Sequence, residues 1–542
     1  MRPRLRVPAL CLAAFLLALP MSSGAALGRT IGSAKGVIAK PSDFNGDGYA
    51  DLAVGVPGED VGSATDTGGV NVLYGSAKGL SATSNQFWDE TGTGSATDAS
   101  GDNFGWAEAT GDFNGDGFAD LAVGVPFKDV GGAPDAGAVS ILYGSPAGLA
   151  AAGSQQWDQD LLGTIAEAND GLGASVATGD VNGDGYDDLA VGAPGETVGS
   201  IGAAGAVNVA LGSAAGLTAT GAEYWNQNTA GVLNKAETDD EFGFSVVIGD
   251  FDGNGFGDLA VGVPFEDLLS GGVSREDAGG VNVLYGSAAG LTSTDDDFWN
   301  QDNPGIEGSV ETGDWFGYAV GTGDFDGNGF DDLLVGVPLE DIAGLGDPGG
   351  ANVIYGTLTG LDSAGNKFWD QNSVGISGGA EAGDTFGFAV SAGDFNGDGF
   401  DDAAIGVPGE DIKKVSDAGA TNVIYGSATG LDDPGNQVWD QDTSGIGGTA
   451  EAGDIFGVSV TAADYGNGPE DDLASGVQGE DIGTIVDAGA ASVIYGSPSD
   501  LTSTGNQLWY QDSTGIAGKS EKSDVFGWGL GQPGTGGSLT PR

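Results

Sequence analysis

A short acidic segment recurs along the chain at nearly constant intervals, and this recurrence limits the possible folds more than any other feature. The segment reads Asp-x-(Asn/Asp)-Gly-(Asp/Asn)-Gly, and the intervals are 69, 68, 70, 74, 70 and 70 residues. It begins at Asp43, Asp112, Asp180, Asp250, Asp324 and Asp394, with a degenerate copy at Asp464. A tryptophan keeps the same interval, at Trp88, Trp157, Trp225, Trp299, Trp369, Trp439 and Trp509. Because self-similarity at a fixed period marks a repeat architecture, we expect seven copies of one structural unit.

The sixth unit predicts the secondary structure of each copy. Its sequence favours strands over 386–390, 403–407 and 421–425, and a short fourth strand around 438–439. Four strands, many turns and no helical periodicity are typical of a propeller blade. We therefore predict an all-β, seven-bladed β-propeller of four-stranded antiparallel blades. A solenoid is the alternative, but solenoid repeats are usually shorter than about 45 residues.

The ends of the chain predict how the ring closes. A Phe-Gly or Leu-Gly pair opens a strand between successive units, at Phe104, Leu172, Phe242, Phe316, Phe386 and Phe456, and once more at Phe526 after the last tryptophan. The first unit has only residues 35–39 in the equivalent place. We expect the C-terminal strand at 526–528 to complete the first blade, because closure removes exposed strand edges. Residues 35–39 are the alternative.

The first 26 residues have the layout of a signal peptide. Arg2, Arg4 and Arg6 precede an apolar stretch at 7–19, and small residues follow at 23–26. We therefore expect a signal peptide over 1–26, a single propeller over 27–542, and secretion to the extracellular space or the cell surface. A lipid anchor on Cys11 is the alternative. No later stretch approaches the roughly 18 apolar residues of a membrane span.

Charge and composition narrow the partners and the chemistry. Acidic residues outnumber basic residues 79 to 16, for a net charge of −63. Such a surface repels phosphate backbones and anionic headgroups, so a cation is favoured over nucleic acid or a membrane surface. The chain has no histidine, and its one cysteine is Cys11. This excludes imidazole-activated nucleophiles and His-ligated zinc or iron.

The intact acidic segments are predicted to bind calcium. Each has oxygen-bearing side chains at positions 1, 3, 5 and 9 of a nine-residue loop and glycine at position 6. Positions 1, 3 and 5 and the carbonyl at 7 are the ligand positions of the EF-hand loop. Here the closing acid is at 9 and β-type residues follow, so the loop is expected to join two strands. Four side chains, one carbonyl and water would supply the roughly 6 to 8 oxygens that Ca²⁺ takes.

The predicted ligands fall into six loops. They are Asp43, Asn45, Asp47, Tyr49 and Asp51; Asp112, Asn114, Asp116, Phe118 and Asp120; Asp180, Asn182, Asp184, Tyr186 and Asp188; Asp250, Asp252, Asn254, Phe256 and Asp258; Asp324, Asp326, Asn328, Phe330 and Asp332; and Asp394, Asn396, Asp398, Phe400 and Asp402. The seventh copy has Gly466 and Gly468 at positions 3 and 5 and Pro469 at position 6. We therefore expect about six calcium ions and none in the seventh loop.

Two simpler explanations of the loops are weaker. Magnesium demands a tight octahedron, and transition metals prefer imidazole or thiolate ligands. Aspartate, asparagine and glycine also favour turns without any metal. A turn alone does not need acids at positions 1, 5 and 9 in copy after copy.

The repeat resembles the FG-GAP family, the seven-bladed propeller of integrin α-chains. Its two name motifs are present as Phe386-Gly387 and Gly192-Ala193-Pro194, and the second reads Gly-Val-Pro from Gly55, Gly124, Gly262, Gly336 and Gly406. The resemblance covers about residues 35–530. It implies calcium loops between the first two strands of a blade on one face, ligands on the other face, and adhesion or recognition outside the cell. The thigh-like and calf-like domains, the membrane helix and the inserted adhesion domain of integrins are missing.

Three functions follow from these patterns. The first is a monomeric recognition or cell-adhesion module that binds an extracellular protein or cell-surface ligand through an acidic rim of Glu-Asp pairs, such as Glu59-Asp60, Glu266-Asp267, Glu340-Asp341 and Glu410-Asp411. The second is a lectin-like propeller whose Trp-(Asp/Asn)-Gln-(Asp/Asn) segments stack on glycans, although packing between blades is favoured for these tryptophans. The third is a hydrolase or lyase that uses paired carboxylates. We expect no enzyme, because no acid pair breaks the periodicity.

Overall fold

The structure is a computed structural model that describes residues 39–94, 99–432 and 435–533. The predicted signal peptide and most of residues 35–39 lie outside the described residues. Within the described part nearly all regular structure is β, and one short helix, α1 (Gln159–Leu162), follows the fourth strand of the second blade. No helix in this part is long and apolar enough to cross a membrane.

The strands form seven propeller sheets, which confirms the predicted fold class. The first three hold β1 (Leu52–Val56), β2 (Gly69–Tyr74) and β3 (Ser81–Trp88); β4 (Glu108–Gly111), β5 (Asp120–Val125), β6 (Ala138–Tyr143) and β7 (Ala150–Trp157); and β8 (Ser175–Gly179), β9 (Asp188–Ala193), β10 (Ala206–Leu211) and β11 (Thr218–Trp225). The fourth holds β12 (Ser245–Gly249), β13 (Asp258–Val263), β16 (Gly280–Tyr285) and β17 (Thr292–Trp299), with a separate hairpin of β14 (Leu268–Ser270) and β15 (Val273–Arg275) inserted in it.

The last three sheets repeat this order. They hold β18 (Val320–Gly323), β19 (Asp332–Val337), β20 (Gly350–Thr357) and β21 (Gly360–Trp369); β22 (Val390–Gly393), β23 (Asp402–Val407), β24 (Ala420–Ile424) and β25 (Gln437–Trp439); and β26 (Val460–Ala463), β27 (Asp472–Val477), β28 (Ala490–Tyr495) and β29 (Thr502–Trp509). In each sheet, neighbouring strands in sequence pair antiparallel. The short β30 (Gln532–Pro533) instead pairs parallel with β4.

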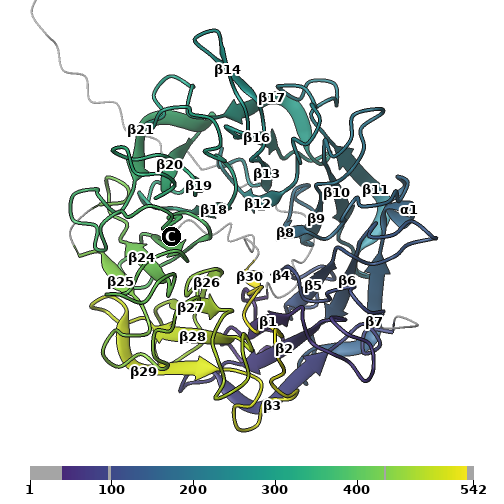
Figure 1. Cartoon of the computed structure of the whole chain (residues 1–542). Helices are drawn as coiled ribbons and strands as arrows, with labels where there is room; N and C mark the ends of the chain where they lie inside the picture. Colours follow the sequence, from purple (N-terminus) through teal and green to yellow (C-terminus); the bar gives the residue numbers. More distant parts are fainter. Residues whose placement is uncertain (1–38, 95–98, 433–434, 534–542) are drawn as a thin grey trace, which may run out of the picture. The chain divides into compact units, whose positions relative to one another are not determined.

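The first strands of the blades lie next to one another around the centre of the ring (Figure 1). Contacts run from β4 to β8, β12, β18, β22 and β26, then through β30 back to β4. The second strands are apolar and buried along their whole length, as in Leu121 to Val125 of β5. Since each sheet is covered on both faces by its neighbours, these strands need no polar face.

The C-terminal segment closes the ring, as predicted. Val54 of β1 pairs with Leu530 in an antiparallel bridge. The Gly55 amide donates to the Gly529 carbonyl at 2.9 Å, and the Gly527 amide donates to the Gly55 carbonyl at 3.0 Å. Residues 527–531 therefore fill the inner-strand place of the first blade, whose own strands are only β1, β2 and β3.

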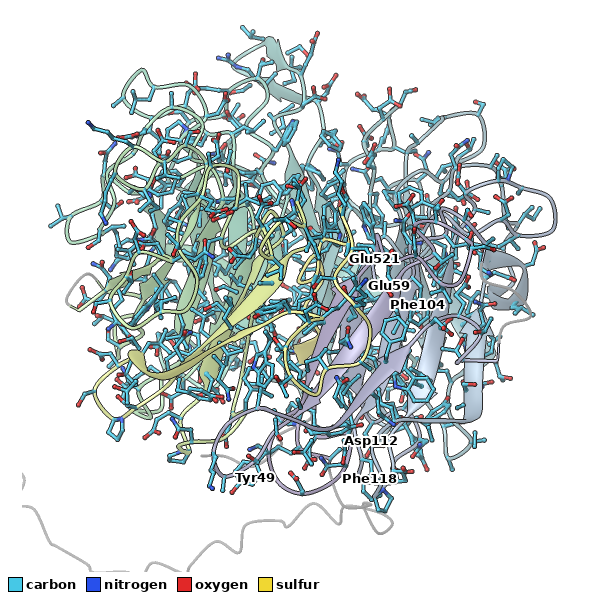
Figure 2. All side chains as sticks on the ribbon, turned by 60° about the horizontal axis from the view of Figure 1, so that its bottom comes forward. Tyr49, Glu59, Phe104, Asp112, Phe118 and Glu521 are labelled. Carbon is cyan, nitrogen blue, oxygen red and sulfur yellow. The ribbon has the colours of Figure 1, made fainter. Side chains whose placement is uncertain are left out.

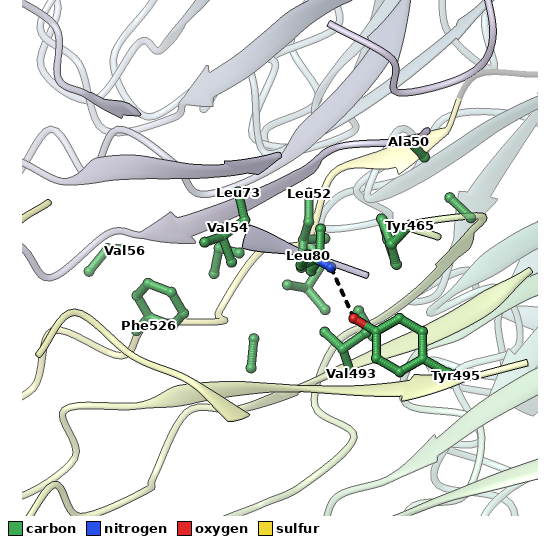
Figure 3. Packing of buried hydrophobic residues seen from close by; sticks show 14 residues of the cluster. Ala50, Leu52, Val54, Val56, Leu73, Leu80, Tyr465, Val493, Tyr495 and Phe526 are labelled. Carbon is green, nitrogen blue, oxygen red and sulfur yellow. Dashed lines mark hydrogen bonds between the residues drawn. The ribbon is translucent and has the colours of Figure 1, made fainter. Parts of the chain in front are cut away.

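Each pair of adjacent blades encloses an apolar cluster. At the closing junction, Val54, Leu80 and Phe526 pack with Tyr495, whose hydroxyl accepts a hydrogen bond from the Leu80 amide at 3.0 Å (Figure 3). The phenylalanine of each Phe-Gly pair is fully buried in such a cluster, as Phe526 is here. The seven blades are therefore joined by repeated copies of the same apolar contact.

The first strand of each blade begins later than predicted. In the sixth blade β22 starts at Val390, whereas the sequence predicted a strand from residue 386. Gly387 has a φ of 92°, and Phe386 bridges in parallel to Gly349 of the preceding blade. The Phe-Gly pair is therefore a turn that anchors one blade to the previous one.

Candidate metal centres

The acidic loops lie together at one edge of the ring, which we call the loop edge. Six of the seven loops join the first two strands of a blade, and the loop at 43 leads into β1. The Phe-Gly and Gly-x-Pro motifs at the other ends of these strands therefore lie at the opposite edge, the Phe-Gly edge. Figure 2 shows the separation: Tyr49, Asp112 and Phe118 lie at one end of the molecule, away from Glu59, Phe104 and Glu521.

The aspartate at position 1 holds the loop closed. In the loop at 394, Asp394 Oδ1 accepts from the Asp398 amide at 3.0 Å, and Oδ2 accepts from the Gly399 amide at 2.9 Å. The Phe400 amide donates to the Asp398 side chain at 3.0 Å. Gly397 and Gly399 have φ values of 71° and 91°, in the left-handed region where glycine is unstrained.

The aspartate at position 9 is fully buried and ties the loop to the third strand. Asp402 accepts from the Phe395 amide at 2.9 Å and from the Gly426 amide at 2.8 Å. Burial raises the pKa of Asp402 to about 8 and that of Asp332 to about 9. Asp472 of the degenerate loop makes the same two bonds. The acid at position 9 therefore has a structural role in every blade and is not by itself diagnostic of a metal.

Two loops bring three carboxylates together. Asp250, Asp252 and Asp258 place one oxygen each within 4.8 Å of one another, and so do Asp324, Asp326 and Asp332. No positively charged side chain pairs with these acids in the part of the chain that the structure describes. Three converging carboxylates fit a hard, oxygen-preferring cation.

The other four loops have asparagine at position 3 and aspartate at position 5. Asn182 Oδ1 accepts from the Asp184 amide at 2.9 Å, whereas its amide nitrogen donates to Asp188 at 3.2 Å. Asn45 directs its amide nitrogen to Asp51 in the same way. In either loop, a 180° rotation of the asparagine amide would turn its oxygen toward the aspartate at position 9, which is Asp188 or Asp51.

The side chain at position 7 contacts the neighbouring loop. A Cβ placed on Gly46 would lie 2.6 Å from the Phe118 ring, and one on Gly327 would lie 2.5 Å from the Phe400 ring. Glycine is thus required at position 4 for two reasons: the aromatic side chain of the neighbouring loop leaves no room for a Cβ, and the backbone has a positive φ. Only the backbone carbonyl of the position 7 residue remains a predicted ligand.

A hydrogen bond joins each loop to the next around the whole ring. The amide at position 8 of one loop donates to the carbonyl at position 1 of the preceding loop, as from Asp401 to Asp324 at 3.1 Å. The last of these bonds runs from Ala50 to Asp464 at 2.8 Å and crosses the closing junction. The seven loops are therefore one continuous hydrogen-bonded belt.

The degenerate seventh loop contains an ammonium group. Lys40 Nζ lies 2.7 Å from Asp464 Oδ2 and donates to the Gly48 carbonyl at 3.0 Å. Asn467 takes the left-handed conformation at position 4, with a φ of 73°. Pro469 stands at position 6, where Gly399 needs a positive φ that proline cannot adopt. Lys40 thus pairs with the aspartate at position 1. Among the described residues, the aspartate at position 1 of the intact loops forms no ion pair.

The predicted acidic rim is wrong for the glutamates. Glu266 is 1% exposed and accepts from the Gln227 amide of the preceding blade at 2.7 Å. Burial raises its pKa to about 8. Asp267 is exposed, but its side chain accepts the Asp277 amide at 3.0 Å and so pins its own loop. The sequence pattern could not show this burial, because the covering glutamine comes from another blade.

The tryptophans pack between blades, as the favoured alternative predicted. Trp369 and Trp439 are 5% and 6% exposed. The five others are partly buried against the apolar clusters: Trp88, Trp157, Trp225, Trp299 and Trp509. Two of the seven are therefore buried, and the other five pack part of their surface against an apolar cluster between blades.

Aromatic side chains gather at the Phe-Gly edge, and sequence reasoning did not single them out. We call Phe244, Phe265, Trp315, Tyr318 and Phe388 the aromatic arc. Their rings contact one another in sequence, with centroids 4.9 to 5.7 Å apart. A second group joins Trp106 to Phe127 and Trp528. The signal lay in the residue after each Phe-Gly pair, which is aromatic in five copies: Trp106, Phe244, Tyr318, Phe388 and Trp528.

Comparison with known proteins agrees with this geometry. The FG-GAP repeat model matches residues 40–73, 104–142, 172–209, 242–284, 316–355 and 386–424. Integrin alpha-V of Gallus gallus is 32% identical over 278 residues, which are 48% of this chain and 23% of the relative. Integrin alpha-PS2 of Drosophila melanogaster is 33% identical over 175 residues, 31% of this chain and 11% of the relative.

Two further proteins that the comparisons matched are enzymes by name. Phosphatidylinositol-glycan-specific phospholipase D of Bos taurus is 34% identical over 154 residues, 28% of this chain and 18% of the relative. Among solved structures, a Bacillus licheniformis rhamnogalacturonan lyase matches 93% of this chain and 95% of its own, at 12% identity and a TM-score of 0.32. The matched regions thus span less than a quarter of each sequence relative.

The six matched repeats each contain a Phe-Gly or Gly-x-Pro motif and an acidic loop in the same order as the blades described above. The chain is therefore an FG-GAP repeat protein with an integrin-like β-propeller.

Proposed function

We propose that the protein is a calcium-stabilised extracellular recognition module. The observation that carries this proposal is the convergence of three carboxylate oxygens within 4.8 Å in the loops at 250 and 324. Among the residues that the structure describes, no lysine or arginine forms an ion pair with them. Like charges at this separation repel one another, and a bound divalent cation would remove that repulsion while adding coordination.

The side chains at positions 1, 3, 5 and 9 would hold the ion. The bound ion would supply positive charge, and the chain supplies the rigid loop. The aspartate at position 1 already orders the loop through two backbone bonds, and the aspartate at position 9 is fixed between two amides. Little ordering would then remain to oppose binding.

The Phe-Gly edge offers the surface for a partner. The aromatic arc supplies large, rigid side chains, which dominate binding energy in protein interfaces. Phe127 in the second aromatic group is 37% exposed. This edge lies opposite the loops, so metal binding and partner binding need not compete for the same residues.

We propose recognition and not catalysis. Without histidine, and with its one cysteine at residue 11, the chain has no imidazole to activate a nucleophile and no thiol outside the predicted signal peptide. Glycan recognition is the second candidate for the partner class, and the aromatic arc, not the buried tryptophans, is the feature that favours it.

The test combines ion counting with binding. Native mass spectrometry of protein equilibrated with calcium should show one ion fewer in Asp398→Ala than in wild type, and no change in Asp464→Ala. Binding to cells and to a glycan array should weaken at least tenfold in Trp315→Ala, whereas Leu269→Ala on the exposed hairpin β14–β15 serves as the matched surface control. No calcium bound at any loop, or turnover of a polysaccharide or phosphodiester, would overturn the proposal.

A further inference from the structure

A second set of acidic groups is buried at the Phe-Gly edge, between the blades. At six junctions the amide nitrogen of a glutamine that follows the blade tryptophan donates to a glutamate of the next blade. The Nε2 to Oε2 distances are 2.5 to 2.7 Å for Gln159–Glu196, Gln227–Glu266, Gln301–Glu340, Gln371–Glu410, Gln441–Glu480 and Gln511–Glu59. These junctions are distinct from the acidic loops, which lie at the opposite edge.

Each junction holds a second carboxyl group. Asp240 lies near Glu266 and raises its pKa, and both residues are 1% exposed. One oxygen of Asp240 accepts from the Glu237 amide. The equivalents of Asp240 are Asp170, Asp314, Asp384, Asp454 and Asp524, each 1% exposed. Among the described residues, no ion pair within 4.0 Å involves any of these carboxyls. Two buried carboxyl groups without a cation are costly unless something neutralises them.

The glutamine at each junction also has an unused oxygen. Its Nε2 is committed to the glutamate, so the amide lies at the carboxyl groups, yet its Oε1 accepts no hydrogen bond. This holds at all six junctions, for Gln159, Gln227, Gln301, Gln371, Gln441 and Gln511, each at most 5% exposed. Buried polar atoms are normally satisfied, so an oxygen orphaned at every copy points to a partner that is not a protein group.

The seventh junction differs from the other six and contains a cation. There, glutamate replaces the glutamine and lysine replaces the glutamate. Lys128 Nζ lies 2.8 Å from Glu90 Oε1 and 3.3 Å from Asp102 Oδ2. Glu90 is 1% and Asp102 4% exposed. The chain thus places its own cation among the carboxyl groups at the one junction that lacks the glutamine–glutamate pair.

We propose that each of the six glutamine–glutamate junctions binds one hard cation of the calcium type, with the glutamine Oε1, the glutamate and the aspartate as its ligands. At the seventh junction the Lys128 ammonium takes the place of that ion. One divalent cation would balance the two carboxylates, and all three ligands are oxygens, which calcium prefers. These sites do not depend on the acidic loops.

The test exchanges the two kinds of junction. Gln227→Glu/Glu266→Lys builds a Glu–Lys pair at a calcium-type junction, and we expect native mass spectrometry in calcium to count one ion fewer than in wild type. Glu90→Gln/Lys128→Glu builds a glutamine–glutamate junction at the seventh position, and we expect one ion more. The junction at Asp314 is not used, because Arg275 also faces it.

Two controls separate this proposal from the loop sites. Asp398→Ala removes a loop ion and should leave both junction differences intact. If an exchanged protein fails to fold, the single variant Glu266→Gln preserves size and polarity and should still lose one ion. Equal ion counts in wild type, both exchanges and Glu266→Gln would overturn the junction sites, even where the loop ion is lost in Asp398→Ala.

Discussion

The loop at Asp324 and the loop at Asp464 occupy equivalent places in the ring and share the same buried acid at position 9. In the first, three carboxylates converge without a cationic partner. In the second, glycines stand where the first has Asp326 and Asn328, and Lys40 pairs with the acid at position 1. The difference lies at the junction where the two ends of the chain meet. There a covalently attached cation takes the place that we propose for a bound calcium ion in the other loops.

The same exchange occurs at the opposite edge, where Lys128 stands among the carboxyl groups of a single junction. In both places the repeat tolerates the loss of acids only where a lysine has been gained. We infer from this difference that the acids in the other copies take a positive partner from solution and do not merely keep the surface soluble.

Removal of calcium by a chelator should lower the stability of the protein more than any single variant does, because all six intact loops would lose their ions. A calcium ion that binds the native state but not the unfolded chain stabilises the native state by about 2.7 kcal/mol per site when free calcium is 100 times Kd. We therefore expect the melting temperature in calcium to exceed that in chelator by a large margin. Differential scanning calorimetry in the two buffers measures it, and identical melting curves would remove the distinction between the intact and degenerate loops.

Loss of the closing strand should be the next largest effect. A chain ending at Gln511 lacks Phe526, which is fully buried, and burial of a phenylalanine is worth about 3 to 5 kcal/mol. A chain ending at Pro533 is the matched control and should unfold like the full protein. Urea titration compares the three, and equal stability of the shorter chain would mean that residues 35–39 can close the ring.

Single loop variants sharpen the comparison directly. Asp398→Ala should lower the calcium-dependent part of the unfolding free energy by about the 2.7 kcal/mol of one site, at the same calcium excess. Asp464→Ala should leave that part unchanged, because Lys40 and not calcium partners Asp464. A calcium-dependent loss in Asp464→Ala equal to that in Asp398→Ala would show that the seventh loop binds an ion after all.

A buried acid beside the closing strand should make stability depend on pH. Burial raises the pKa of Glu108 well above its usual value, and neither carboxyl oxygen accepts a hydrogen bond. Since the unfolded chain releases this proton at lower pH than the folded protein, stability from this group is present below the unfolded pKa and is lost as pH rises toward the folded pKa, at about 1.4 kcal/mol per unit. Glu108→Gln should therefore unfold at higher urea than wild type at pH 8, and the gap should shrink toward pH 5. A constant gap would contradict this.

Lys40→Ala should have the smallest effect. Its side chain is 36% exposed, and pairs at such sites contribute at most about 1 kcal/mol. The loss should fade in high salt, which thermal melts at two salt concentrations would detect. If calcium raised the stability of Lys40→Ala by more than it raised that of wild type, an ion would be entering the seventh loop in place of the ammonium.

Local signals predicted the fold and the loops, because the blade, its turns and the acidic spacing all lie within one repeat. The strand start at Phe386 was misplaced, since the Phe-Gly turn is set by a contact with Gly349 of another blade. The burial of Glu266 and the pairing of Glu90 with Lys128 were missed for the same reason. The sequence shows Glu90 and Lys128 in place of the glutamine and glutamate of the other units. Their pairing cannot be predicted without knowing which blades are neighbours.

The closing strand also fixes the order in which the molecule can be finished. Strands β1 to β3 are made first, yet the inner-strand place beside β1 is filled by residues 527–531, near the end of the chain. Until those residues exist, β1 has an open edge, and an open edge can pair with other chains. Among the seven blades, the first along the chain is therefore the last to be completed, and its edge stays open until residues 527–531 have been made.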